Sequence, residues 1–315
     1  MHNTMNRSIF YALLCLLVLV ASGCQRRQST KVYGRYVPER KDDFAWENEY
    51  AAFRLYGPAL APENPSNGVD LWLKASPELI VDSFYYREHV LGLPYHINYG
   101  KGLDCYKVGH TAGCGGLVIV ADDRLWTAGP YSSWEILCQT PDLFRFRLTY
   151  DSLPVAGEVL CGTLTVTAEA GKMLNKAEVV ISPRDGNSDN LPFLEAGGGI
   201  FLHDTVENYF IDDVTGCVAY AEDALSDKQA AKMNYDYNGS VSQGRTYAAV
   251  VTYCASRQDI IEGTLVSLRG YMLGDTLTYF FGGCWSNWSD GKRSFPTDID
   301  WFDAVAAEAE CYYSL

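Results

Sequence analysis

The side chains best suited to acid–base chemistry gather in one glycine-rich segment, residues 95–116 (YHINYGKGLDCYKVGHTAGCGG). The segment holds two of the five histidines in the chain and several other polar groups: His96, Tyr99, Asp104, Tyr106, Lys107 and His110. Glycine permits positive φ and a close approach of the backbone to a ligand. Titratable side chains on such a loop therefore predict a site for a small polar substrate rather than part of a core.

Histidine, tyrosine and lysine together are suited to eliminative cleavage of a uronate. This reaction needs a positive group for the carboxylate, a base for the C5 proton and an acid for the leaving oxygen. The residues expected in these roles are Arg54 or Lys107 for the carboxylate, His96 or His110 as the base, and Tyr99 or Tyr106 as the acid. A sugar mutarotase or epimerase would need a similar acid–base pair.

Hydrolysis of a glycosidic bond would instead need two carboxyl groups about 5–9 Å apart. Asp104 with Glu47 is one such pair, and Asp42 with Asp43 is another. Adjacent acids in a sequence do not predict that spacing, so elimination is the reaction that we expect.

Two further candidate binding residues lie outside the glycine-rich segment. Arg54 stands in a strand-like apolar run, where its guanidinium suits either bidentate binding of a uronate carboxylate or an internal ion pair with Glu47 or Glu49. His203 follows the glycines 197–199 at the end of a predicted strand, which makes it a second candidate site residue.

Aromatic residues near the C-terminus suggest a surface for sugar rings. Trp285 and Trp288 lie in the loop-like sequence GGCWSNWSD and are expected to bind substrate, whereas Tyr279 and Phe281 alternate along a strand and are expected in the core. Asp104 is expected either to bind substrate or to brace its own loop through backbone amides.

The N-terminal segment has the form of a lipoprotein signal peptide. Arg7 precedes an apolar run over residues 9–20, and small residues lead to Cys24 in the sequence VASGC. The run is shorter than the about 20 apolar residues that a transmembrane helix needs. VASGC resembles a bacterial lipobox, which implies cleavage before Cys24 and acylation of that cysteine. We expect an outer-membrane lipoprotein that faces the periplasm and is held there by its N-terminal lipid.

The rest of the chain is expected to form one domain, residues 32–315, after a signal peptide (1–23) and a tether (24–31). The net charge of −14 argues against nucleic acid as a partner. The eight cysteines that follow Cys24 have neither CxxC nor zinc-like spacing, so we expect no metal and no other cofactor. We expect these cysteines to be mostly free, buried thiols.

The dominant pattern along this domain is that of β-strands. Alternating or β-branched runs bounded by Gly, Asn, Asp and Pro predict strands over 144–150, 162–170, 176–182, 246–254 and 275–283. Two helices are expected, one led by the capping sequence 76–78 (SPE) and one after Asp298 or Asp300 to the C-terminus. Many strands with few helices indicate a large antiparallel sandwich.

Four segments resemble domain of unknown function family 4861, in the family's order. They are ERKDDFAWENEYAAFRLYGPAL (39–60), GVDLWLK (68–74), YHINYGKGLDCYKVGHTAGCGG (95–116) and LTYFFGGCWSNWSD (277–290). The resemblance implies an all-β-dominated β-supersandwich similar to galactose mutarotase. It also implies a secreted protein or lipoprotein of Gram-negative polysaccharide degraders, beside enzymes that break down uronate-rich glycans such as pectins. It assigns no reaction.

The family pattern often reads HxDHG where this chain has HINYG (96–100), so Asn98 and Tyr99 replace the acid and the second histidine. The expected function is action on uronate-containing oligosaccharides by acid–base elimination. The alternatives are a non-catalytic glycan-binding lipoprotein, a glycoside hydrolase or a sugar epimerase on the same fold. The departures at Asn98 and Tyr99 favour binding.

Overall fold

The computed structural model describes residues 29–63, 68–184, 191–203, 208–232, 241–287 and 295–313. The predicted signal peptide, the lipidation site Cys24 and the tryptophan Trp288 lie outside these ranges. Residues Lys31–Leu315 form one compact unit, to which the following description applies. In the described part of this unit, no helix is long and apolar enough to cross a membrane.

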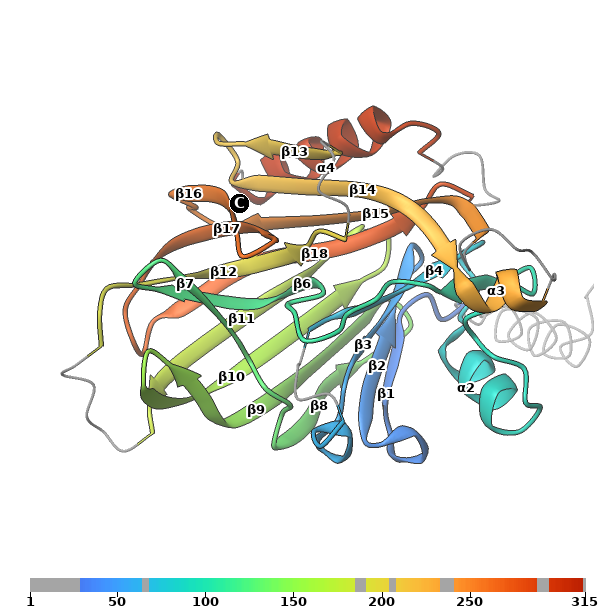
Figure 1. Ribbon diagram of the computed structural model, residues 1–315, viewed down its shortest axis with the longest axis horizontal. Helices are drawn as coiled ribbons and strands as arrows, with labels where there is room; N and C mark the ends of the chain where they lie inside the picture. Colours follow the sequence, from blue (N-terminus) through green and yellow to red (C-terminus); the bar gives the residue numbers. More distant parts are fainter. Residues whose placement is uncertain are drawn as a thin grey trace, which may run out of the picture. The chain divides into compact units, whose positions relative to one another are not determined.

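The largest element of the unit is an eight-stranded antiparallel sheet (Figure 1). Its strands, in spatial order, are β13 (Tyr209–Asp212), β14 (Cys217–Ser226), β15 (Val241–Thr252), β18 (Thr276–Trp285), β11 (Leu174–Pro183), β10 (Glu158–Glu169), β9 (Leu143–Val155) and β8 (Ser133–Gln139).

Two five-stranded antiparallel sheets accompany it. The first, called the N-terminal sheet, contains β1 (Tyr33–Val37), β2 (Asp43–Glu47), β3 (Ala51–Leu55), β4 (Asp70–Lys74) and β5 (Gly102–Asp104). The second contains β16 (Arg257–Ile261), β17 (Thr264–Tyr271), β12 (Leu194–Phe201), β6 (Cys114–Ala121) and β7 (Arg124–Thr127).

Helices are short and few among the described residues. They are the α-helices α2 (Val81–His89), α3 (Asp227–Lys232) and α4 (Asp298–Tyr313), with the 3-10 turns η1 (Pro38–Arg40) and η2 (Pro58–Leu60). The expected β-dominated antiparallel sandwich with few helices, one of them C-terminal, is confirmed.

Alternation along each strand divides the side chains between two faces of the large sheet. In β9, Phe144, Phe146 and Leu148 are buried, while the intervening Arg145 and Arg147 are exposed. In β18 the odd-numbered side chains lie in the core between the sheets: Leu277, Tyr279, Phe281 and Trp285. A period of two therefore gives the sheet one apolar inner face.

Aromatic rings hold the N-terminal sheet against the inner face of the large sheet. Phe44 stacks on Phe146 with ring centroids 4.3 Å apart, and Phe53 meets Phe281 edge-on at 5.9 Å. Such rings bury large apolar areas. Trp285 belongs to the same core cluster with 2% exposure, because it continues the inward row of β18. The expectation that Trp285 forms an exposed sugar platform is therefore wrong, whereas the core placement of Phe281 is confirmed.

Helix α4 packs on the opposite face of the large sheet, across β14 and β15 (Figure 1). Trp301 is fully buried there, stacks on Tyr247 at 5.6 Å and donates from its indole nitrogen to the carbonyl of Ala248 at 3.2 Å. The helix begins with a reciprocal cap, in which the Asp300 amide donates to the Thr297 hydroxyl and the Asp300 carboxylate accepts from the Thr297 amide.

Helix α2 starts later than the sequence predicts. The local capping sequence at 76–78 does not cap it; instead the buried carboxylate of Glu47 accepts hydrogen bonds from the amides of Ile80 and Val81, at 2.8–3.0 Å. Lys74 lies 2.7 Å from the same carboxylate. A carboxylate is favourable at a helix N-terminus because it meets free amides and the positive end of the helix dipole.

All eight cysteines in the described residues are free thiols, as expected. Cys114, Cys217 and Cys284 are buried, but Cys254 and Cys311 are exposed. The expectation of burial is wrong for Cys254 because β15 ends at Thr252, which places this cysteine in the following turn.

The buried Lys74–Glu47 pair predicts a large effect on stability. Lys74→Met leaves the Glu47 carboxylate buried without its counter-charge and is expected to lower the free energy of unfolding by about 3–5 kcal/mol. Lys101→Met is the matched control, because the Lys101–Glu78 pair is exposed and should cost less than about 1 kcal/mol. Urea unfolding measures both. Equal costs for the two variants would contradict this account of α2.

Candidate functional site

A cavity of about 390 Å³ lies beside the segment that the sequence singles out. Its walls come from η1, the end of β3, the loops before and after β5, the end of β14 and the start of α3. Its charged and titratable lining residues are Arg40, Arg54, Tyr56, His96, Asp104, Cys105, Tyr106, Lys107, Asp227 and Lys228. The cavity therefore brings together five residues that the sequence analysis proposes for the site: Arg54, His96, Asp104, Tyr106 and Lys107. Its other charged and titratable lining residues were not predicted.

Arg54 is the centre of the polar network behind this cavity. Its guanidinium is 3% exposed and pairs with three carboxylates: Asp70 through a short contact, Asp104 at 3.1 Å and Asp43 at 3.7 Å. It also donates to the Tyr95 hydroxyl at 3.1 Å. The alternative of an internal ion-paired arginine is thus observed, although Glu47 and Glu49 are not the partners. These pairs leave Arg54 poorly placed to clamp a substrate carboxylate.

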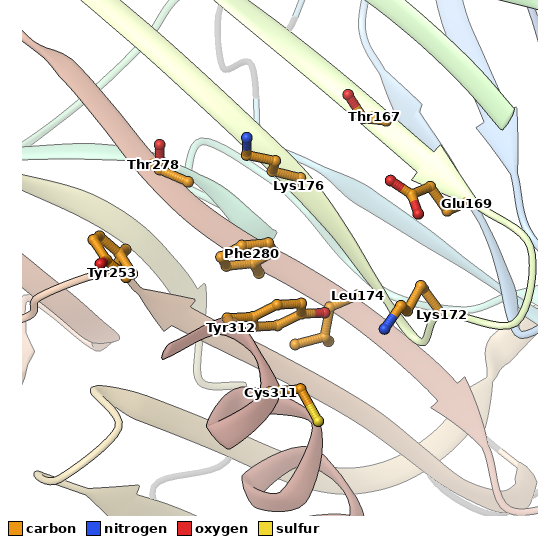
Figure 2. A pocket seen from close by; sticks show the side chains of 10 residues that line it. All are labelled: Thr167, Glu169, Lys172, Leu174, Lys176, Tyr253, Thr278, Phe280, Cys311 and Tyr312. Atoms are coloured by element: carbon orange, nitrogen blue, oxygen red, sulfur yellow. The ribbon is translucent and has the colours of Figure 1, made fainter. Parts of the chain in front are cut away.

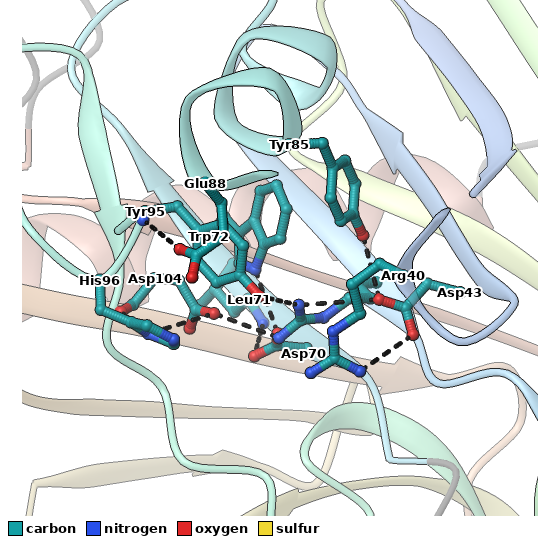
Figure 3. Close-up of polar contacts among 11 residues, drawn as sticks. Arg40, Asp43, Asp70, Leu71, Trp72, Tyr85, Glu88, Tyr95, His96 and Asp104 are labelled. Atoms are coloured by element: carbon teal, nitrogen blue, oxygen red, sulfur yellow. Dashed lines mark hydrogen bonds and ion pairs between the residues drawn. The ribbon is translucent and has the colours of Figure 1, made fainter. Parts of the chain in front are cut away.

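The carboxylates around Arg54 are themselves held by neighbours (Figure 3). Asp70 accepts from the Trp72 indole at 3.1 Å, and Asp43 accepts from the Tyr85 hydroxyl at 3.2 Å. Burial and the nearby Asp70 raise the pKa of Asp104 well above its usual value. The guanidinium of Arg54 opposes this shift, because it favours the charged carboxylate.

Arg40 also presents its guanidinium to the cavity, and the sequence analysis did not predict this role. Its side chain is 23% exposed, with Asp43 at 3.5 Å. Both Arg40 and Arg54 lie over the ring of Tyr56, at 5.7 and 5.0 Å from its centroid. The sequence does not indicate this, because Arg40 reaches the cavity only through the η1 turn between β1 and β2.

His96 is held in one tautomer by its own loop. Its Nδ1 lies 3.0 Å from the backbone oxygen of Asp104, which can only accept, so Nδ1 carries the proton (Figure 3). In the neutral ring, Nε2 then has a free lone pair. Burial, followed by the charge of Lys228, lowers the pKa of His96. His96 is therefore a neutral imidazole at the wall of the cavity near pH 7.

Helix α3 supplies part of the cavity wall, and the sequence reading did not predict this helix. The Ser226 hydroxyl donates to the His96 carbonyl at 2.6 Å and accepts from the Gln229 amide at 3.0 Å. Lys107 pairs with Asp227 at 2.9 Å, and Lys228 lines the cavity without a carboxylate at ion-pair distance among the described residues. These contacts fix α3 against the loop that carries His96.

Tyr106 and His203 brace the cavity loop from behind. The Tyr106 hydroxyl is buried and donates to the Phe201 carbonyl at 3.0 Å. His203 lies edge-on to the Tyr106 ring, bonds Glu222 through Nδ1 at 2.8 Å and bonds the Lys107 carbonyl through Nε2 at 2.5 Å. Burial acts to lower the pKa of His203, but the hydrogen bond and the charge of Glu222, together with the Lys107 carbonyl, outweigh burial and raise the pKa.

Two residues proposed as an acid or a base do not line the cavity. Tyr99 lies between two cations, 4.5 Å from the Arg87 guanidinium and 4.2 Å from the Lys232 ammonium. His110 is exposed on a turn beyond the cavity. Tyr99 precedes Asp104 and His110 follows Gly109, and the chain has left the cavity wall at both positions. Closeness in the sequence does not show this.

The carboxylate pairs considered for hydrolysis are not assembled in the cavity. Glu47 is fully buried under α2, and neither Asp42 nor Asp43 lines the cavity. Within the described part of the chain, the carboxylates that line the cavity are Asp104 and Asp227. Among the described residues, no three His, Cys, Asp or Glu side chains are grouped as metal ligands would be.

The glycines of the segment mostly serve contacts between strands. At Gly102, where φ is +127°, a Cβ would overlap the Leu73 carbonyl of β4; at Gly113, where φ is +64°, it would overlap the Val69 carbonyl. Gly109, which lines the cavity with φ +55°, has open space around it. The expected close approach to a ligand is therefore available only at Gly109 among these three.

Comparisons with known proteins place this chain within a family. Uncharacterized protein P7 of Formosa agariphila is 25% identical over 293 residues, which cover 90% of this chain and 69% of that protein. A solved structure described as a kojibiose phosphorylase from the human microbiome is 8% identical, with a TM-score of 0.41. That alignment covers 92% of this chain and 36% of the phosphorylase. The family model matches residues 23–312, so the chain belongs to the family described as Domain of unknown function (DUF4861).

Proposed function

We propose that this protein acts on uronate-containing oligosaccharides by elimination in the cavity beside Asp104. The observation that carries the proposal is the placement of His96, a single-tautomer imidazole, in a wall shared with Arg40 and Lys228. Sugar-sized ligands bind in cavities of about 300–1,000 Å³ lined by a few fixed polar groups. The volume of about 390 Å³ falls within this range.

The cationic groups suit a sugar carboxylate. Arg40 and Lys228 both line the cavity, and the Arg40 guanidinium is more accessible than that of Arg54. A guanidinium binds a carboxylate through two parallel hydrogen bonds. In this proposal Arg40 takes the role that the sequence suggested for Arg54, and neutralising the carboxylate makes the C5 proton more acidic.

His96 is assigned both proton transfers. Its Nε2 removes the C5 proton, the C–H electron pair forms the C4–C5 double bond, and the C4–O bond breaks. The leaving oxygen then takes the proton back from the His96 imidazolium. One residue is assigned to both steps because the Tyr106 hydroxyl already donates to Phe201, and burial raises the pKa of Tyr56, which makes it a poor acid.

A non-catalytic glycan-binding protein is the second candidate. The engagement of Tyr106 with Phe201 and the position of Tyr99 outside the cavity favour it, because both tyrosines considered as the acid are then absent from the reaction. Hydrolysis and epimerisation are less well supported as reactions. Among the described lining residues there is no second histidine, and the carboxyl groups of Asp104 and Asp227 are paired with Arg54 and Lys107.

His96→Gln is expected to lower the rate of elimination by about 10²–10⁴-fold, the usual contribution of a general base. The matched control is His110→Gln, which removes an exposed histidine of the same segment outside the cavity and should leave the rate unchanged. The assay follows the ultraviolet absorbance of the unsaturated uronate with a panel of uronate oligosaccharides.

The same assay separates the two candidate functions. No absorbance and no new reducing ends, together with measurable binding of an oligosaccharide, would overturn the enzyme and support the binding protein. Equal rates in His96→Gln and His110→Gln would place the reaction elsewhere in the molecule.

The pH dependence should depend on Lys228. Its positive charge lowers the pKa of His96, so Lys228→Gln should raise that pKa by at most about 1 pH unit and move the acid limb of the activity profile to higher pH. Lys232→Gln, on the same helix but outside the cavity, is the control. The His96 ring signals in an NMR titration give the same readout without turnover. A downward movement would contradict the assignment.

We propose that the protein is attached to the outer membrane, facing the periplasm, by a lipid on Cys24. Cys24→Ser should abolish incorporation of labelled palmitate in a bacterial host, whereas Cys15→Ser, within the preceding apolar run, should retain it. When the same cells are fractionated, the Cys24→Ser variant should be absent from the outer-membrane fraction. Labelling that persists in Cys24→Ser would refute the anchor.

A further inference from the structure

A second and larger groove, of about 580 Å³, lies on the outer face of the eight-stranded sheet (Figure 2). Strands β10, β11 and β18 form its floor, and the last turn of α4 forms one side. None of its lining residues lines the cavity beside Asp104. The groove is therefore a separate feature, to which neither the sequence analysis nor the proposed reaction assigns a role.

The floor of the groove carries polar side chains in a regular array. Thr167, Lys176 and Phe280 are direct neighbours across β10, β11 and β18. Thr278 lies two residues from Phe280 on the same face, and Glu169 lies two residues from Thr167. Because the paired strands fix these positions, hydroxyl, amino and carboxylate groups are presented in a rigid pattern.

Aromatic rings beside this array are held in place by stacking and by hydrogen-bonded tyrosine hydroxyl groups. Tyr312 stacks on Phe280 with centroids 3.6 Å apart and an interplanar angle of 3°, and its hydroxyl donates to Glu308 at 2.5 Å. Tyr253, 39% exposed, stacks on Tyr313 at 5.1 Å, and the Tyr313 hydroxyl donates to the Thr215 carbonyl at 2.8 Å. A ligand that contacts these rings therefore binds without immobilising many further side chains, which keeps the entropic cost of binding low.

The ammonium of Lys172 is the group in the groove that would attract an anionic ligand, although the carboxylate of Glu169 also lines the groove. Lys172 lies 6.0 Å from the centroid of the Tyr312 ring, and no carboxylate of the described residues lies at ion-pair distance from its ammonium. Lys176 also lines the groove, paired with Glu178 at 2.8 Å. In a chain with net charge −14, an ammonium left without a counter-ion beside an aromatic ring is a specific attraction for a carboxylate.

We propose that this groove binds a second segment of a uronate-containing saccharide. Sugars combine apolar C–H faces with hydroxyl groups, which match the Tyr253 and Tyr312 rings and the threonine hydroxyls respectively, and Lys172 binds the carboxylate. The proposal takes its ligand class from the proposed function but requires binding only, with no turnover.

Calorimetry on the full chain tests the groove with an oligogalacturonate and with its carboxyl-reduced, neutral counterpart. Lys172→Gln should weaken binding of the acidic probe about three- to tenfold and leave the neutral probe unchanged. Tyr253→Ala should weaken binding of both probes about tenfold. Lys101→Gln is the matched control, because this exposed lysine lines neither the groove nor the cavity.

The exposed thiol of Cys311, which lines the groove, gives an independent readout. The acidic probe should slow alkylation of Cys311 in the Lys101→Gln variant and have less effect in Lys172→Gln at the same probe concentration. Alkylation is read at Cys311 by peptide mass spectrometry, apart from Cys254, the other exposed thiol of the described residues, so it distinguishes binding in the groove from binding in the cavity.

The failures of this proposal and of the proposed function are distinguishable. Unchanged affinity in both groove variants, or no binding of either probe by the unmodified chain, overturns the groove proposal. Groove-dependent binding without any unsaturated product contradicts the elimination reaction and leaves the groove proposal standing. If His96→Gln blocks turnover while the groove variants bind both probes normally, the elimination reaction is supported and the groove proposal is overturned.

Discussion

The buried ion pairs of Arg54 are the interaction on which the candidate site depends. Arg54 lies in β3 and reaches Asp43 of β2, Asp70 of β4 and Asp104 of β5, so one guanidinium joins four neighbouring strands. Removing water from these charges is costly, and each is stabilised only while its partners stay in place. The network therefore specifies one arrangement of the edge of the N-terminal sheet, from which the cavity loop departs.

The position of His96 follows from that arrangement. Asp104 is held by Arg54, and its backbone oxygen in turn holds Nδ1 of His96. The same loop is tied to β14 and α3 through Ser226, whose hydroxyl donates to the His96 carbonyl. The Asp104 backbone oxygen thus orients the imidazole, and the Ser226 hydroxyl holds the backbone of His96, which is the support that a general base or a fixed ligand-binding group requires.

The two polar regions of the molecule are built differently. In the cavity beside Asp104, charges are buried and paired, and His96, Arg40 and Lys228 are the groups left to meet a ligand. In the groove on the large sheet, a regular strand face presents polar groups at fixed spacing, with stacked rings beside them. Buried charge suits orientation of a reacting group, whereas an open sheet face suits contact with an extended chain.

Sequence alone determined the β-dominated class, the C-terminal helix and the segment that contributes most to the cavity. Strand periodicity and glycine-rich loops are local signals, so β9, β18 and the segment around His96 and Asp104 could be predicted. The start of α2 could not, because its cap is Glu47, a residue of a distant strand rather than of the local sequence.

Only the tertiary structure decided which side chains meet. It buried Arg54 among three carboxylates, brought Arg40 and Lys228 to His96, engaged the hydroxyl of Tyr106 and enclosed Trp285 in the core. Residue type and local pattern indicate what a side chain can do. Its partners, and hence its charge state and accessibility, depend on contacts between segments that lie far apart in the sequence.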